Sequence, residues 1–176
     1  MIIMYSKEVL IPENVNVEVI GSKVKVSGPK GSLERVFQLN GLKLEKKDNK
    51  IVVSSEQDRR EFKALVGTTI AHIGNLIEGA TKGFIYKLKV VFSHFPIQMK
   101  VEKDKVLFMN FLGERSPRIA KIIGSTEVKI EGQDITVSGI DLEDVGQTAS
   151  NLEQATRRTG YDKKVFQDGC YIISRE

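Results

Sequence analysis

The fold is decided by residues 51–77, which read IVVSSEQDRREFKALVGTTIAHIGNLI. The stretch opens with β-branched apolar residues, a composition typical of a buried strand. After a polar link at residues 54–61, apolar residues recur at spacings of three and four, which places them on one face of a helix. The polar residues 55–58 predict the start of that helix and Gly79 its end. A strand followed directly by an amphipathic helix predicts an α+β unit.

The same plan occurs a second time further along the chain. The sequence IVVS at 51–54 resembles ITVS at 135–138, and the strand-like run ending in a glycine loop at 24–31 resembles the run at 106–113. The two offsets, 84 and 82 residues, are nearly equal, which indicates a duplication. Because solenoid repeats have periods of about 20 to 50 residues, a period of this length is a whole domain.

The alternating apolar runs before each helix predict short strands joined by tight turns. The predicted fold class is therefore α+β, with two duplicated domains, each a mostly antiparallel sheet packed against a helix. We expect an N-terminal domain at residues 1–81, a C-terminal domain at 82–159 and a C-terminal tail at 160–176. The second helix is predicted from apolar residues within 142–152, with Asp141 as its N-cap.

Composition excludes several broad classes of protein. With 40% hydrophobic and 28% charged residues in 176, the chain is too apolar for a disordered protein and too mixed for a coiled coil. It has no apolar run of about 18 residues, so we expect no membrane span. The first residues lack the features of a secretion signal, and Cys170 is the single cysteine. Both features predict a cytoplasmic protein.

Charge is distributed unevenly along the chain, although the formal net charge is only +4. Residues 81–100 contain four basic and no acidic residues, whereas residues 131–153 contain six acidic and no basic residues. Such asymmetry suggests one face directed at a polyanion and another directed at solvent or a different partner.

Catalytic and metal-binding patterns are weak. His72 and His94 fall in different units, and no Cys/His spacing typical of zinc is present. The densest acidic cluster consists of Asp141, Glu143 and Asp144. Acids in the first turn of a helix stabilise its dipole and its free amides, and we favour this interpretation. The alternative is a metal-dependent RNA-acting enzyme that uses these carboxylates. A third hypothesis is a protein-interaction module that uses the acidic surface.

Two glycine loops, at 28–31 and 110–118, are better candidates for a binding surface. Glycine lets backbone amides approach an anion, and Lys30, Arg115 and Arg118 add charge beside them. Both loops could equally be ordinary turns. Aromatic residues make up 7% of the chain and tryptophan is absent, which disfavours a protein that stacks successive bases of a single strand. Structured RNA recognised through its backbone and shape fits better.

Four ordered motifs carry a resemblance to a known family. They are YKLKVVFSHFP at 86–96, NFLGE at 110–114, DVGQTA at 144–149 and FQDGCYI at 166–172. With the loop at residues 26–31, they resemble the archaeal and eukaryotic form of the sixth large-subunit ribosomal protein over essentially the whole chain. Cys170 departs from this family, which usually has an aliphatic residue there.

The resemblance implies a structural constituent of the large ribosomal subunit and not an enzyme. It implies large-subunit rRNA as the partner, near the base of the stalk, the sarcin-ricin loop and the translation-factor site, with neighbouring large-subunit ribosomal proteins beside it. It implies a cytoplasmic location in the ribosome, no cofactor, no metal, no small-molecule substrate, no membrane and no obligate homo-oligomer. The implied RNA-binding residues are Lys30, Gly31, Asn110, Gly113, Arg115, Ser116, Arg118, Lys121, Arg157, Arg158, Lys163, Lys164, Gln167 and Asp168.

Overall fold

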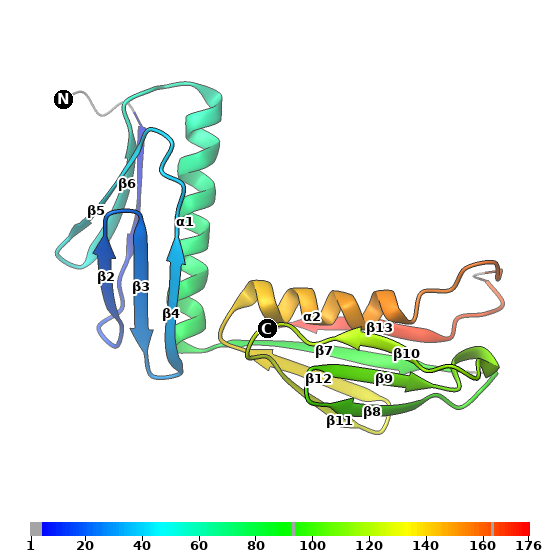
Figure 1. Cartoon of the computed structure of the whole chain (residues 1–176). Helices are drawn as coiled ribbons and strands as arrows, with labels where there is room; N and C mark the ends of the chain where they lie inside the picture. The colour runs from blue at the N-terminus through cyan, green and yellow to red at the C-terminus, as the bar shows by residue number, and fades with distance from the viewer. Residues whose placement is uncertain (1–4, 93, 163) are drawn as a thin grey trace. The chain divides into compact units, whose positions relative to one another are not determined.

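A computed structural model describes residues 5–92, 94–162 and 164–176 (Figure 1). The chain divides into two compact units; unit 1 ends at Gly83 and unit 2 begins at Phe84. Each unit contains one long helix and two antiparallel sheets. The predicted α+β fold class is confirmed.

Unit 1 combines two three-stranded sheets with a 22-residue helix. Its elements are β1 Tyr5–Leu10, β2 Asn16–Ile20, β3 Lys23–Gly28, β4 Gly31–Val36, β5 Leu42–Lys47, β6 Lys50–Ser55 and α1 Arg60–Thr81. The strand orders are β1-β6-β5 and β2-β3-β4. The pattern of residues 51–77 thus becomes the central strand β6 followed by α1.

Unit 2 repeats this plan and extends it by one strand. Its elements are β7 Phe84–Val91, β8 Gln98–Glu102, β9 Lys105–Met109, the 3-10 turn η1 Phe111–Gly113, β10 Arg118–Lys121, β11 Glu127–Glu131, β12 Asp134–Gly139, α2 Leu142–Ala155 and β13 Gly169–Arg175. The sheet β8-β9-β10 corresponds to β2-β3-β4, and the order β11-β12-β7 corresponds to β5-β6-β1. Strand β13 is added beside β7 and has no counterpart among the described strands of unit 1.

Each unit has its own hydrophobic core, made where the helix covers its sheets. In unit 1, the fully buried residues Val66 and Ile73 of α1 pack with Ile51 and Val53 of β6. In unit 2, Val145, Ala149 and Leu152 of α2 occupy the corresponding place among buried residues of β7 and β12. Burial of these apolar side chains is the main favourable contribution to folding.

The ends of the elements differ from the prediction in three places. Helix α1 begins at Arg60 with no side-chain cap, because the side chain of the N-cap residue Arg59 has no acceptor. The Ser55 hydroxyl accepts from the Gln57 amide in a local turn before the helix. The helix continues past Gly79 to Thr81, whose hydroxyl donates to the Ile77 carbonyl. We expected residues 160–176 to form a separate tail. They contain strand β13, which pairs with β7 inside unit 2.

Gly28 at the end of β3 lies directly against the last turn of α1. A Cβ atom built at this position would come within 2.5 Å of the Ala80 carbonyl oxygen, and the Lys30 amide donates to that same oxygen at 3.0 Å. This close approach fixes the helix on the sheet and requires a residue without a side chain.

We therefore expect Gly28→Ala to destabilise unit 1 by about 1–3 kcal/mol, because helix and strand must move apart. Gly74→Ala is the matched control, since Gly74 lies within α1 with open space around it. Helix propensity alone predicts that this change stabilises the protein by about 0.5–1 kcal/mol. Urea unfolding of both variants measures the two changes, and equal effects of the same sign would contradict this packing.

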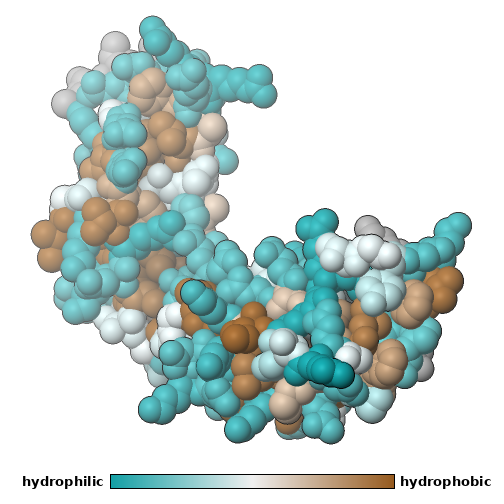
Figure 2. All heavy atoms as spheres, turned by 45° about the vertical axis from the view of Figure 1, so that its right-hand side comes forward, coloured by the Kyte–Doolittle hydropathy of each residue, from teal (hydrophilic) through white to brown (hydrophobic). Residues whose placement is uncertain are grey.

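On the face shown in Figure 2, the surface of each unit is largely hydrophilic with separate apolar patches. The most exposed large apolar residues include Ile20, Val36 and Leu10, at 70%, 67% and 66% exposure. Within the described residues, no helix is long and apolar enough to cross a membrane.

Candidate nucleic-acid interface

The loop between β9 and β10 has a strained, tightly folded backbone. The φ angles of Asn110, Leu112 and Gly113 are 59°, 49° and 76°. These values lie in the left-handed region, which residues other than glycine rarely adopt. Phe111 anchors the loop because its side chain is completely buried. Residues 114–117 then emerge into solvent with their side chains exposed. The fold therefore displays this loop at the edge of the sheet.

Arg118, the first residue of β10, joins this loop to the end of α2. Its guanidinium donates through Nε and Nη2 to both oxygens of Glu114, at 2.8 and 2.5 Å. Through Nη1 it donates to the Ala155 and Arg157 carbonyls at 3.2 and 2.8 Å, and it lies over the Phe111 ring. These carbonyls lie at the C-terminus of α2, where backbone acceptors lack helical partners. Arg118 thus serves as a positioning residue inside unit 2.

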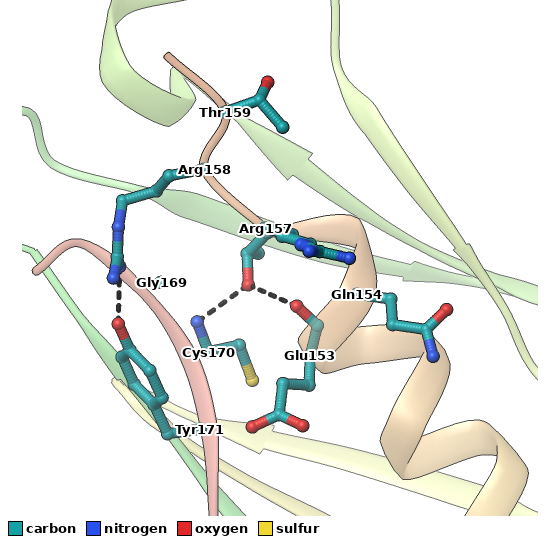
Figure 3. A pocket seen from close by; sticks show the side chains of 9 residues that line it. Glu153, Gln154, Arg157, Arg158, Thr159, Gly169, Cys170 and Tyr171 are labelled. Atoms are coloured by element: carbon teal, nitrogen blue, oxygen red, sulfur yellow. Dashed lines mark hydrogen bonds between the residues drawn. The ribbon is translucent and has the colours of Figure 1, made fainter. Parts of the chain in front are cut away.

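The segment that follows α2 is held against β13 by a second set of hydrogen bonds. The Thr156 hydroxyl accepts from the Cys170 amide at 2.8 Å and donates to the Glu153 carbonyl at 3.1 Å. Arg158 donates through Nη1 to the Asp168 carbonyl at 2.6 Å and to the Tyr171 hydroxyl at 2.5 Å (Figure 3). The chain therefore leaves the helix along a fixed path.

A group of aromatic and polar side chains fixes the remaining loops. The buried Asp168 carboxylate accepts from the His94 amide at 3.3 Å and lies 3.1 Å from the His94 ring nitrogen Nδ1. The His94 ring stacks on Phe166 with 4.4 Å between centroids, and Tyr161 packs on Phe166 at 4.9 Å. Such ring contacts add to the apolar burial.

These contacts bring three segments to one end of unit 2. Asn110 Nδ2 donates to the Pro96 carbonyl at 3.1 Å, which links the η1 loop to the chain after β7. The η1 loop (green) and the segment before β13 (orange to red) both lie at this end of unit 2 in Figure 1. We call the exposed residues here the end surface: Asn110, Gly113, Arg115, Ser116, Arg157, Lys164 and Gln167.

The other predicted site residues lie elsewhere. Lys121 is at the far end of β10, opposite Lys105 on β9. Lys30 and Gly31 form the β3–β4 turn of unit 1, where Lys30 is exposed. Lys163 lies outside the described residues.

Arg118, Arg158 and Asp168 have internal roles that the sequence analysis did not predict. Asp168 is only 1% exposed, so its carboxylate is directed to His94 and not to a ligand. Arg118 donates to Glu114 and to two backbone carbonyls, and Arg158 donates through Nη1 to the Asp168 carbonyl and the Tyr171 hydroxyl. These residues therefore hold the loops that carry the end surface.

The acidic cluster at the start of α2 has a structural explanation. The Asp141 carboxylate accepts from the Glu143 amide at 2.8 Å as the predicted N-cap. Asp144 packs against Gly124, where a Cβ atom would collide with its carboxylate. Burial, with the nearby charges of Asp141 and Glu143, raises the pKa of Asp144. Among the described residues, no group of three or more His, Cys, Asp or Glu side chains is placed to hold a metal ion.

Cys170 at the start of β13 is 1% exposed. Burial, together with the charge of Glu153, raises the pKa of its thiol to about 12.

We expect Cys170 to resist alkylation by iodoacetamide at pH 8 in the folded protein, because both access and the thiolate fraction are very low. In 6 M guanidinium chloride the same thiol should react at the rate of a free cysteine. Mass spectrometry of the timed reaction measures both rates. Fast labelling of the folded protein would contradict the burial of Cys170.

The sequence analysis missed the residues that assemble this surface. The stacking of Phe166 on His94 joins residues distant in sequence, so it follows from the tertiary fold. Glu114 pairs with Arg118 and Tyr161 packs on Phe166 within short stretches of the chain, but neither pair follows a pattern that the sequence marks as a contact. For His94 and Phe166, a signal was present, because both belong to motifs that carry the family resemblance.

Two duplicated α+β units, one of which ends in an exposed basic loop surface, define a structural protein suited to a polyanionic partner. A family model described as "Ribosomal protein L6" matches residues 11–83 and 95–169. The chain belongs to this ribosomal protein family.

Individual relatives match almost the whole chain. A protein of Methanosarcina mazei is 47% identical over 170 residues, which cover 97% of both chains. Proteins of Ignicoccus hospitalis and Staphylothermus marinus are 50% and 52% identical, covering 94% of this chain and 92% of theirs. All three are named "Large ribosomal subunit protein uL6". The resemblance found in the sequence is confirmed.

Proposed function

We propose that the protein is a non-enzymatic constituent of the large ribosomal subunit that binds large-subunit rRNA through the end surface of unit 2. Membership of the ribosomal protein L6 family supports the ribosomal role. The main observation for the binding site is that the η1 loop and the segment between α2 and β13 bring exposed basic side chains to one end of unit 2.

The mechanism is neutralisation and positioning of phosphates. Arg115, Arg157 and Lys164 are exposed and supply positive charge to the RNA backbone. The turn at Gly113 allows backbone groups to come close to a phosphate, and Asn110, Ser116 and Gln167 supply neutral hydrogen bonds. Arg118, Arg158 and Asp168 act indirectly, by holding these segments in place. Lys30, Gly31 and Lys121 provide separate contacts outside the end surface.

We place this binding near the base of the stalk, close to the sarcin-ricin loop and the translation-factor site, as the family resemblance implies. The partners are then large-subunit rRNA and neighbouring ribosomal proteins, in the cytoplasm. The enzyme hypothesis receives no support from the acidic cluster, because Asp141 caps a helix and Asp144 packs against Gly124.

The salt dependence of rRNA binding tests this proposal. Each neutralised phosphate should contribute about 0.7 to 0.9 to the slope of log affinity against log salt concentration. Filter binding of an rRNA transcript from the same organism at several salt concentrations gives the slope. A slope near zero would contradict recognition through phosphates.

A further inference from the structure

A pocket of about 350 Å³ opens beside the end surface, between the end of α2 and the start of β13 (Figure 3). Its lining residues are Glu153, Gln154, Thr156, Arg157, Arg158, Thr159, Gly169, Cys170 and Tyr171. Ligand pockets in proteins have volumes of about 300 to 1,000 Å³, so this pocket is suited to one small ring system.

One wall carries a hydrogen-bond donor that is not satisfied. The Nε of Arg158 is buried and has no hydrogen-bond partner in the part of the chain that the structure describes. Its Nη1 is fixed on the Asp168 carbonyl and the Tyr171 hydroxyl, so the guanidinium cannot turn away without breaking both bonds. Buried polar groups are nearly always paired in native proteins, so a small shift of the Arg158 side chain that exposes Nε to the pocket would be stabilised by an acceptor on a bound ligand.

The other walls combine planar, neutral and acidic groups. In Figure 3 the Cys170 side chain lies between Tyr171 and Arg158 on one side and Glu153 and Gln154 on the other. The thiol stays protonated at neutral pH because its pKa is raised to about 12, which keeps this part of the pocket uncharged. Tyr171 is 37% exposed, and its ring is a flat apolar group.

We propose that this pocket binds one unpaired nucleobase of large-subunit rRNA, an inference that rests on the proposed function. A nucleobase is flat, neutral and bordered by both hydrogen-bond acceptors and amino donors. Its acceptors match the Arg158 Nε donor, and an amino group matches the Glu153 carboxylate. Arg157 lies at the same pocket and is exposed, so it can contact the phosphate of the bound nucleotide.

The mixed charges of the lining disfavour a charged protein side chain as the occupant and favour a neutral group. Glu153 would repel an acidic side chain, and the guanidinium groups of Arg157 and Arg158 would repel a basic one. Proteins read structured RNA by binding bases that are unstacked from loops and bulges, often against aromatic or arginine side chains. Such binding needs one pocket and not a row of aromatic residues, so it is compatible with the low aromatic content of this chain.

Filling the pocket with a large side chain tests this inference. Gln154 and Thr159 are exposed lining residues, so Gln154→Trp and Thr159→Trp should block the pocket without disturbing the core. Gln147→Trp is the matched control, because Gln147 is an exposed glutamine of α2 that does not line the pocket. Thermal unfolding followed by circular dichroism checks that each variant folds.

We expect both pocket variants to bind the rRNA transcript about 5- to 100-fold more weakly than wild type, as loss of one base contact predicts. The salt slope should be unchanged, because no phosphate contact is removed. Chemical probing of base edges should show one unpaired base that wild type protects and that becomes reactive in both variant complexes. The Gln147→Trp variant should match wild type in all three measurements.

Other results would overturn the inference in distinguishable ways. If wild type binds and both pocket variants bind equally well, the pocket holds no base, while the proposed function stands. A reduced salt slope in the variants would indicate a phosphate in the pocket. Normal rRNA affinity with lost incorporation into large subunits would indicate a protein partner. If wild type does not bind rRNA, the proposed function fails and this inference fails with it.

Discussion

Replacing Arg118 with alanine should destabilise unit 2 by about 2–4 kcal/mol and weaken rRNA binding at the same time. The change removes donors from two carbonyls at the end of α2 and leaves them without these partners. It also removes the bidentate pair with Glu114 and the contact with the Phe111 ring. The Arg118 side chain is only 23% exposed, so water replaces these interactions incompletely. Urea unfolding and filter binding measure the two effects.

Arg115→Ala is the matched control on the same loop. The Arg115 side chain is exposed, so its removal should change stability by less than about 0.5 kcal/mol. Its affinity for rRNA should nevertheless fall, because one phosphate contact is lost. If Arg118→Ala proved as stable as Arg115→Ala, the assignment of Arg118 as a positioning residue would be wrong.

The effect of Arg118→Ala should also depend on pH. The hydrogen bond from Arg118 lowers the pKa of Glu114 from its ordinary value of 4.5. This pair therefore stabilises the folded state above pH 4.5, and its contribution is lost as the pH falls through the lowered pKa. The difference in unfolding free energy between wild type and Arg118→Ala should accordingly narrow in acid.

The second large effect is expected from removing three charges of the end surface together. At 0.1 M salt, the triple change of Arg115, Arg157 and Lys164 to alanine should weaken rRNA binding about 10²- to 10³-fold. The salt slope should fall by roughly 2 to 3, because each residue neutralises one phosphate. Stability should change little, since all three side chains are exposed. Filter binding across a range of salt concentrations gives both numbers.

A second triple variant separates local contacts from overall charge. Lys100, Lys103 and Lys129 are exposed lysines of unit 2 that lie on β8, the β8–β9 turn and β11, outside the end surface. Changing them to alanine alters the net charge by the same amount. If both triple variants lost equal affinity, binding would depend on general charge and the end surface would have no special role.

The fold could be predicted from sequence because its signals are local. The β-branched run at residues 51–53 predicts a strand, and the helical spacing after it predicts a helix. Both signals can be recognised without knowing the rest of the sequence. The duplication then predicted the second unit from the first. Strand β13 was harder, because its alternation between inward Cys170 and outward Tyr171 is short and follows a basic segment.

The site could be predicted only in outline. Basic residues and glycine loops indicated where an anion could bind. Their spacing does not show which arginine is exposed to a ligand and which one is bound to groups of the protein itself. Arg115 and Arg118 are three residues apart. Glu114 is already near Arg118 in the sequence, but only the tertiary fold brings the carbonyls of Ala155 and Arg157 to Arg118. The same holds for Asp168, whose partner His94 comes from 74 residues earlier.

Crosslinking of the protein to large-subunit rRNA, followed by mass spectrometry of the crosslinked peptides, tests the central claim most directly. If the end surface of unit 2 binds rRNA, ultraviolet light should crosslink peptides that contain residues 110–118 and 154–171. Crosslinks confined to the acidic segment at residues 131–153, or to unit 1 alone, would contradict it.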